Sequence, residues 1–139
     1  MKTLVLFIVV FMATNCGTQK QMSESEISQK KSDNTFLGVW NILSIKNEKL
    51  NSNNAKITFE ADNQVMATIG CNMHRGSFTL NEDKLSIGEL ISTEKYCKDL
   101  DKLETALRKE LSAITHYKLD NNELLLLSNN TITFVLKRP

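Results

Sequence analysis

Residues 69–72, Ile-Gly-Cys-Asn, and residues 92–97, Ser-Thr-Glu-Lys-Tyr-Cys, decide how the rest of the chain is organised. The first stretch closes a segment of alternating apolar and polar residues, and the second leads into the one segment with a strong helical pattern. Each stretch contains a cysteine, Cys71 in the first and Cys97 in the second. A link between these cysteines would fix the start of the helix against the end of a strand.

Apolar and polar side chains alternate over short segments on both sides of these stretches. Asn, Asp and Gly residues interrupt the alternation at the positions where turns would be needed. Period-two alternation with such interruptions is typical of an antiparallel sheet that buries one face. We therefore expect about eight strands, at residues 37–45, 57–59, 65–69, 76–80, 85–87, 117–119, 124–127 and 132–136.

A helical period replaces this alternation after residue 99. Apolar residues then recur at three- and four-residue spacing, at Leu100, Leu103, Leu107, Leu111 and Ile114. Asp101 and Glu104 have the spacing of an N-cap residue and its acidic partner. A single amphipathic helix in a β-rich domain is expected to cover the sheet. The pattern predicts a mainly β (α+β) fold, a small antiparallel β-barrel-like curved sheet of about eight strands with one packed α-helix.

The first 15 residues have the pattern of a lipoprotein signal peptide. Lys2 supplies a positive charge, and residues 4–12 form an unbroken apolar run. Nine residues in a helix rise only about 14 Å, far less than the ~30 Å of a hydrocarbon core. Ala13-Thr14-Asn15 then leads straight into Cys16. This resembles the lipobox of bacterial lipoproteins, so we expect residues 1–15 to be removed and Cys16 to carry lipid. The alternative is an ordinary secretory signal with an unrelated thiol near its end.

Residues 16–35 are expected to be the lipidated Cys16 and a flexible tether, and residues 36–139 the folded domain. The tether is rich in Ser, Gln, Lys and Glu and has few large apolar residues, a composition that does not support a packed core. We expect the protein to be lipid-anchored in the cell envelope, on the periplasmic face of the outer membrane. The membrane is therefore the first predicted partner.

The charge balance argues against nucleic acid as a partner. The chain has 17 Lys and Arg residues against 16 Asp and Glu residues. Removal of residues 1–15 takes away Lys2 alone, which leaves 16 of each sign. Proteins that bind nucleic acid need a concentrated positive field to neutralise phosphates. We therefore expect no nucleic-acid partner.

Cys71 and Cys97 remain as a pair once Cys16 is assigned to lipid. An exported chain meets conditions that tolerate disulfides, and a bridge here would close a loop of about 26 residues, worth about 3.5 kcal/mol of stability. Two buried free thiols are the alternative. In the disulfide interpretation Gly70 provides room for a bend and Asn72 is a turn residue.

Two chemical alternatives use the same cysteines. A zinc site would combine Cys71 and Cys97 with His74 and His116, although the spacing matches no compact zinc finger. A Cys71–His74 catalytic pair would need a reduced thiolate and a third group to orient the histidine. We expect neither, and predict no catalytic residues, no bound metal and no cofactor.

The ordered motifs resemble the META/HslJ-like domain family, from about residue 36 to residue 137. The resemblance rests on Gly38-x-Trp40, Ile57-x-Phe59, Gly70-Cys71-Asn72, Thr93 with Cys97, the leucine-rich helix and the closing leucine-rich hairpin. It implies a barrel-like fold with one helix and a bacterial envelope lipoprotein. Members are linked with stress response, with tolerance to novobiocin and, in a protozoan relative, with virulence and motility.

The resemblance also implies a fold similar to that of the pilotins of secretion systems, which bind the tail of a partner protein, and it implies no catalytic residues. The chain departs from the family at Glu94-Lys95-Tyr96, where small or apolar residues would be expected before the cysteine, which indicates that this segment is not buried throughout. We therefore expect a non-enzymatic, stress-related envelope lipoprotein that binds another envelope protein or polypeptide. The alternative is a carrier or sensor of a small apolar ligand in the mouth of the barrel.

Overall fold

The computed structural model describes residues 36–51 and 54–139. The predicted signal peptide, the lipidation site Cys16 and the tether at 16–35 lie outside these residues. The elements are β1 (Gly38–Ile45), β2 (Glu48–Lys49), β3 (Lys56–Phe59), β4 (Gln64–Thr68), β5 (Met73–Asn81), β6 (Lys84–Ile87), β7 (Ile91–Ser92), α2 (Asp101–Ser112), β8 (His116–Asp120), β9 (Glu123–Ser128) and β10 (Thr131–Lys137).

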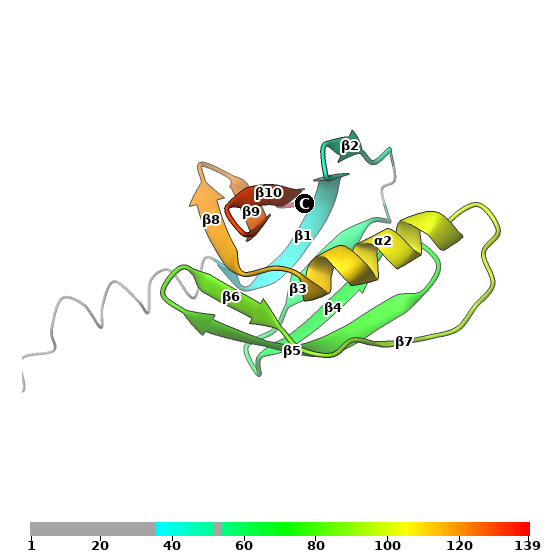
Figure 1. Ribbon diagram of the computed structural model, residues 1–139, viewed down its shortest axis with the longest axis horizontal. Coiled ribbons are helices and arrows are strands. Elements are labelled where there is room, and N and C mark those ends of the chain that lie inside the picture. Colours follow the sequence, from blue (N-terminus) through cyan, green and yellow to red (C-terminus); the bar gives the residue numbers. More distant parts are fainter. Residues whose placement is uncertain (1–35, 52–53) are drawn as a thin grey trace, which may run out of the picture.

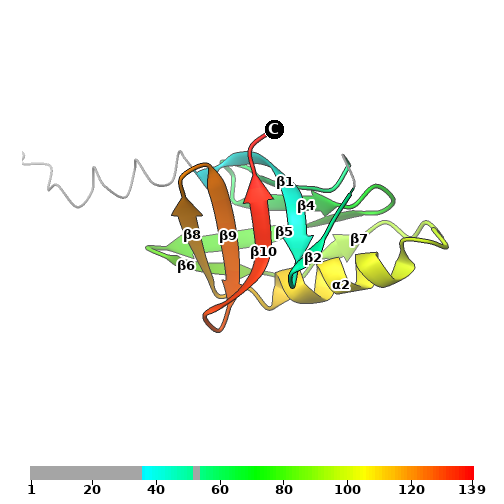
Figure 2. The ribbon, with the colours of Figure 1, turned by 90° about the horizontal axis from the view of Figure 1, so that it is seen from above.

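The strands form a closed ring, as Figures 1 and 2 show. The sheet runs in the order β10-β9-β8-β6-β5-β4-β3-β1-β2, and β10 also pairs with β1, so that eight strands of the described residues close on themselves. All these pairings are antiparallel. The junction of β6 and β8 is short, with one paired position, Lys84 with His116. The predicted mainly β, barrel-like fold with one helix is confirmed.

The interior of the ring is filled by side chains. Phe36, Phe59 and Phe78 are at most 2% exposed, and the ring of Phe59 lies 4.3 Å from that of Phe36 and 5.2 Å from that of Phe78 between centroids. Leu107 and Leu111 of α2 are fully buried. The centre of the ring is therefore a packed core of aromatic and aliphatic side chains, and the alternative of a small apolar ligand in the barrel mouth stays a prediction.

The helix lies across one end of the ring (Figure 2). Lys46, directly after β1, holds the buried Glu110 of α2 through an Nζ–Oε1 contact of 2.9 Å. The predicted leucine stripe is confirmed at Leu107 and Leu111, which face the core. In the described part of the chain, no helix has the length and apolar character that a membrane span requires.

Two sequence-based details were wrong. The N-cap residue of α2 is Leu100 rather than Asp101, and it makes no side-chain capping hydrogen bond. Glu104 does not complete a capping box, because its carboxylate accepts a hydrogen bond from the backbone of Asn72 instead. The strands β2 and β7 were not predicted, since two residues are too few to show an alternating pattern.

The Gly38-x-Trp40 motif holds the C-terminal end of the chain. The guanidinium carbon of Arg138 lies 3.8 Å from the centre of a Trp40 ring, and its Nη2 donates to the Leu37 carbonyl at 2.7 Å. Gly38 has a φ of +108°, and a Cβ there would lie 2.7 Å from Arg138 Nη1. Glycine is therefore required both by the backbone conformation and by the passage of the arginine.

Candidate functional site

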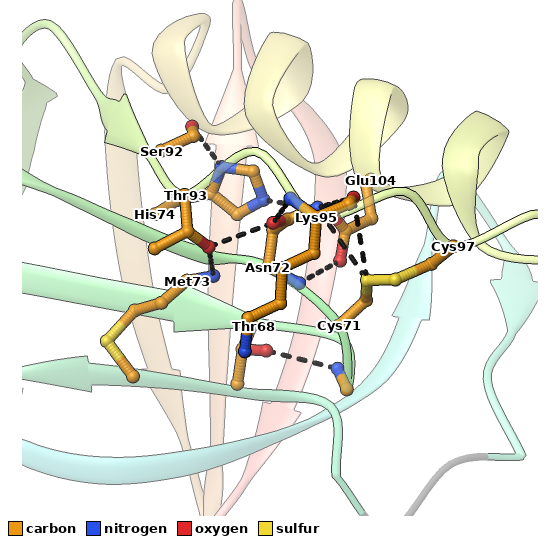
Figure 3. Close-up of polar contacts among 11 residues, drawn as sticks. Thr68, Cys71, Asn72, Met73, His74, Ser92, Thr93, Lys95, Cys97 and Glu104 are labelled. Atoms are coloured by element: carbon orange, nitrogen blue, oxygen red, sulfur yellow. Dashed lines mark hydrogen bonds and ion pairs between the residues drawn. A yellow bond between two sulfur atoms is a disulfide. The ribbon is translucent and has the colours of Figure 1, made fainter.

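A disulfide joins the loop between β4 and β5 to the segment before α2. Cys71 and Cys97 form this bridge, with 6.4 Å between their Cα atoms (Figure 3). The predicted pairing is confirmed. Because both sulfur atoms are used by the bond, neither serves in this state as a free thiol, a zinc ligand or a nucleophile. The bridge makes residues 93–97, which have no regular secondary structure, a fixed part of the fold.

Asn72 holds the same segment through its side chain. Its Oδ1 accepts hydrogen bonds from Thr93 Oγ1 at 2.9 Å and from the Lys95 backbone N–H at 2.8 Å, while its Nδ2 donates to the Lys95 carbonyl at 3.0 Å. Asn72 is buried, at 9% exposure. Asn72 lies in the connection between β4 and β5, as expected for a turn residue, but its amide also binds a segment more than 20 positions away, which was not predicted. Gly70 does provide the predicted bend, with a φ of +113°.

His74 is on β5, and its side chain lies between Ser92 of β7 and Glu104 of α2. Its Nδ1 is 2.6 Å from Ser92 Oγ, and its Nε2 is 3.9 Å from Glu104 Oε2 and has no hydrogen-bond partner (Figure 3). Burial lowers the pKa of His74 below its ordinary value; the Glu104 carboxylate opposes this shift and Arg108 adds to it. The imidazole is therefore neutral at pH 7, and the nearby carboxylate favours the tautomer with hydrogen on Nε2, so that Ser92 donates to Nδ1.

The order Ser92, His74, Glu104 is that of a nucleophilic triad, but the distances differ from those of one. A base and its orienting carboxylate need a hydrogen bond between them, and 3.9 Å is too long for one. The other oxygen of Glu104, Oε1, is held at 2.7 Å by the Asn72 backbone N–H. The arrangement favours a positioning role for these residues, in which they keep β7 against α2.

The remaining zinc candidate is not part of this cluster. His116 lies on β8, where its Nδ1 is 2.9 Å from Thr115 Oγ1. Across residues 36–51 and 54–139, no three His, Cys, Asp or Glu residues lie close enough together to hold a metal ion. The structure therefore joins Cys71 to Cys97 in the disulfide, whereas His74 contacts Ser92 and Glu104 and His116 lies elsewhere.

A groove of about 570 Å³ separates the segment around β7 from α2. Its floor includes Asn72, His74 and Glu104, and its rim carries two large apolar side chains that are mostly exposed, Ile91 at 78% and Tyr96 at 85%. The expectation that residues 94–96 are not buried throughout is confirmed, since all three are exposed. Exposed apolar side chains of this size at the edge of a groove are typical of interaction surfaces.

The outer edge of β7 has no partner strand in the described residues. β7 pairs with β5 alone, through Ser92 opposite His74 and Ile91 opposite Arg75. The Thr93 N–H donates to the Met73 carbonyl at 3.1 Å, which makes positions 73 and 93 a hydrogen-bonded pair. Because such pairs alternate along antiparallel strands, the N–H and C=O of Ser92 point away from β5, and Ser92 is one of the residues that line the groove.

Sequence reasoning did not find Ser92, Glu104 or Tyr96 as site residues. Ser92 and Glu104 reach their partners across 18 and 32 residues of sequence, and no local pattern records such contacts. Tyr96 carries the one usable signal, because an aromatic residue between charged ones in a connecting segment is a candidate for exposure and binding.

Comparisons with known proteins agree with the fold. The model of the META domain family matches residues 34–139. A protein from Burkholderia xenovorans, solved by NMR, has 20% identity and a TM-score of 0.58, over 78% of this chain and 87% of its own. A DUF4847 family protein from Bacteroides vulgatus ATCC 8482 has 16% identity and a TM-score of 0.52, over 73% of this chain and 94% of its own. A further protein solved by NMR has 20% identity and a TM-score of 0.59, over 72% of this chain and 87% of its own. No curated protein matches the sequence.

Proposed function

The chain belongs to the META domain family, and from this premise we propose that it is a non-enzymatic, stress-related lipoprotein of the bacterial cell envelope that binds an extended polypeptide segment of another envelope protein. In this proposal Cys16 carries the lipid anchor, and residues 17–35 connect it to the domain. The bound segment lies in the groove between β7 and α2 and pairs with the outer edge of β7.

The open edge of β7 is the observation that carries this proposal. A strand edge presents unpaired N–H and C=O groups, which an extended peptide can satisfy by adding a strand to the sheet. Ser92 presents both of its backbone groups in this way, and it lines the groove. Main-chain hydrogen bonds would supply affinity, while side chains of the partner would contact the groove on alternate positions.

The edge is also held rigid before any partner arrives. Residues 93–97 carry the disulfide at Cys97, two backbone bonds of Lys95 to the Asn72 amide, and the Thr93 hydroxyl, which accepts from the Met73 N–H at 3.1 Å. A surface that is already ordered loses little conformational entropy on binding. Such constraint on an exposed connecting segment supports a binding role.

Ile91 and Tyr96 are the residues most suited to anchor a partner side chain. Both are more than three-quarters exposed and both line the groove. Tyrosine offers a large contact area with few rotatable bonds, and it is enriched among residues that dominate binding energy. A peptide beside β7 would cover apolar surface that is now in contact with water.

Photo-crosslinking in cells tests the proposal. A benzoylphenylalanine in place of Tyr96 should yield an adduct with another polypeptide, and the same group in place of Lys118, exposed on β8, should not. Replacing Ser92 by proline removes the N–H at the outer edge and should abolish the adduct. Ser92→Ala keeps that N–H, loses only the hydroxyl, and should retain it.

Two outcomes contradict the proposal. Equal adducts from positions 96 and 118 would show that crosslinking is not directed by the groove. An adduct that survives Ser92→Pro unchanged, with the variant still folded by circular dichroism, would show that the partner does not pair with β7.

A further inference from the structure

The groove between β7 and α2 carries an excess of negative charge. Its charged side chains are four acids, Glu89, Glu94, Asp101 and Glu104, against two bases, Lys95 and Arg108. Three of the acids are exposed at the rim, whereas Glu104 is buried on the floor, at 7% exposure. Exposed acids alone are ordinary surface, so the inference depends on the buried one.

One oxygen of the Glu104 carboxylate has no hydrogen bond. Oε1 accepts the Asn72 N–H at 2.7 Å, while Oε2 has only His74 Nε2, at 3.9 Å. That nitrogen is itself a buried atom without a partner in the described residues, on a side chain that is 4% exposed. A buried nitrogen without a hydrogen-bond partner and a carboxylate oxygen whose one printed contact is that nitrogen therefore lie side by side at the floor of the groove.

No cation of the described residues neutralises Glu104. His74 stays uncharged at pH 7, because its burial lowers the pKa. Arg108, one helical turn further along α2, makes no ion pair within 4.0 Å with any residue of 36–51 or 54–139. By contrast, the second buried glutamate of the helix, Glu110, is paired with Lys46 at 2.9 Å. Buried carboxylates are normally paired, so Glu104 is the exception on this helix.

We infer that the groove selects a positively charged segment, whose lysine or arginine side chain reaches the free oxygen of Glu104 while its backbone pairs with β7. This inference rests on the proposed function and adds the chemistry of the partner to it. A charge-assisted hydrogen bond in a partly buried site is about twice as strong as a neutral one. The exposed acids at the rim add attraction at long range, which salt weakens.

Binding of short synthetic peptides separates this inference from the proposed function. The probes are three fluorescein-labelled peptides with capped ends, in which valine alternates with lysine, with serine or with glutamate. Fluorescence anisotropy on the protein with its disulfide intact measures the affinity of each peptide. We expect the lysine peptide to bind most tightly, the serine peptide next and the glutamate peptide least. The first two affinities should differ by at least about tenfold, as expected for a bond to a charged group.

The result decides both statements. Equal affinity of the three peptides, or preference for the glutamate peptide, overturns the inference about charge and leaves the strand-addition proposal standing. If none of the three binds, the proposed function itself loses its support. Acetylating the lysines of the first peptide removes its charge without changing the protein, and should lower its affinity to that of the serine peptide.

Variants of the two buried glutamates place the effect on one residue. Glu104→Gln keeps an oxygen for the Asn72 N–H and loses the charge. It should therefore lower the affinity for the lysine peptide by about tenfold or more and leave the affinity for the serine peptide unchanged. Glu110→Gln is the matched control on the same helix, away from the groove, and should change neither. A Glu104→Gln protein that still prefers lysine to the same degree would overturn the assignment.

Discussion

The Asn72 side chain should contribute about 3 kcal/mol to the stability of the fold. Asn72→Ala removes three hydrogen bonds to residues 93–95, those to Thr93 Oγ1, to the Lys95 N–H and to the Lys95 carbonyl, and a weaker one from Nδ2 to Cys71 Sγ at 3.7 Å. A hydrogen bond contributes about 1 kcal/mol net, and a buried group left without its partner costs more. For a domain of this size we expect the melting temperature to fall by about 12 °C.

Urea unfolding with the disulfide intact measures this change. The chain has a single tryptophan, Trp40, which is 2% exposed, so its fluorescence reports global unfolding. The matched control is Asn81→Ala, because Asn81 is an exposed asparagine on β5. We expect its change to lie within about 0.5 kcal/mol, as is usual for surface positions.

The comparison of the two variants can refute the reasoning. A loss of less than about 1 kcal/mol for Asn72→Ala, with an unchanged dependence on urea, would mean that water replaces the amide without cost. The segment at 93–97 would then be held by the disulfide and the Thr93–Met73 hydrogen bonds, and the Asn72 amide would have to be removed from the links that make the edge rigid.

Three further predictions concern the bridge, the buried histidine and the glycine of the first strand. Reduction with dithiothreitol should lower the free energy of unfolding by about 3.5 kcal/mol, from the 26-residue separation of the two cysteines, and an unchanged urea midpoint would contradict this. Because burial lowers the pKa of His74, the unfolded chain binds its proton more readily, so stability should be full above about pH 6.5 and fall as the pH drops below it; His74→Gln should flatten this slope in urea titrations, and His116→Gln should not. Gly38→Ala should lower the free energy of unfolding by about 2 kcal/mol in the same assay, because position 38 has a φ of +108° and the new Cβ would meet Arg138. A loss below about 0.5 kcal/mol, the usual limit for surface sites, would contradict both the backbone strain and the contact with the arginine.

The eight strands of the ring were predictable because each buries one face. β6 and β3 show why, since their exposed and buried residues alternate without interruption. The same rule could not find β7, whose two residues are exposed and partly exposed. An edge strand that buries neither side chain leaves no period in the sequence, although it is the element on which the proposed function depends.

The contacts of the candidate site were predictable only where chemistry restricts the partners. Cysteine pairs with cysteine, so Cys71 had one available partner once Cys16 was set aside, and the structure confirms it. Asparagine and glutamate accept many partners, and local rules assigned Asn72 to a turn and Glu104 to a helix cap. The two residues contact each other instead, across 32 positions. Hydrogen bonds between side chains of distant segments depend on how the strands close into a ring, and a local sequence pattern does not record that arrangement.

The links around β7 differ in kind, and this has a consequence for binding. The disulfide restrains the segment even in the unfolded chain, whereas the Asn72 amide acts only once its partner backbone has arrived. Together they hold an irregular segment in one conformation. In a protein without such links, the ligand would have to order the segment, and binding would lose about 0.5–1.5 kcal/mol for each immobilised side chain. Here the backbone of residues 93–97 is already ordered in the folded protein, so most of this entropy is lost before binding, while the Ile91 and Tyr96 side chains remain exposed. In the proposed function, a partner that adds a strand here therefore needs few side-chain contacts to bind, and we expect the charge of Glu104 to decide which partner is chosen.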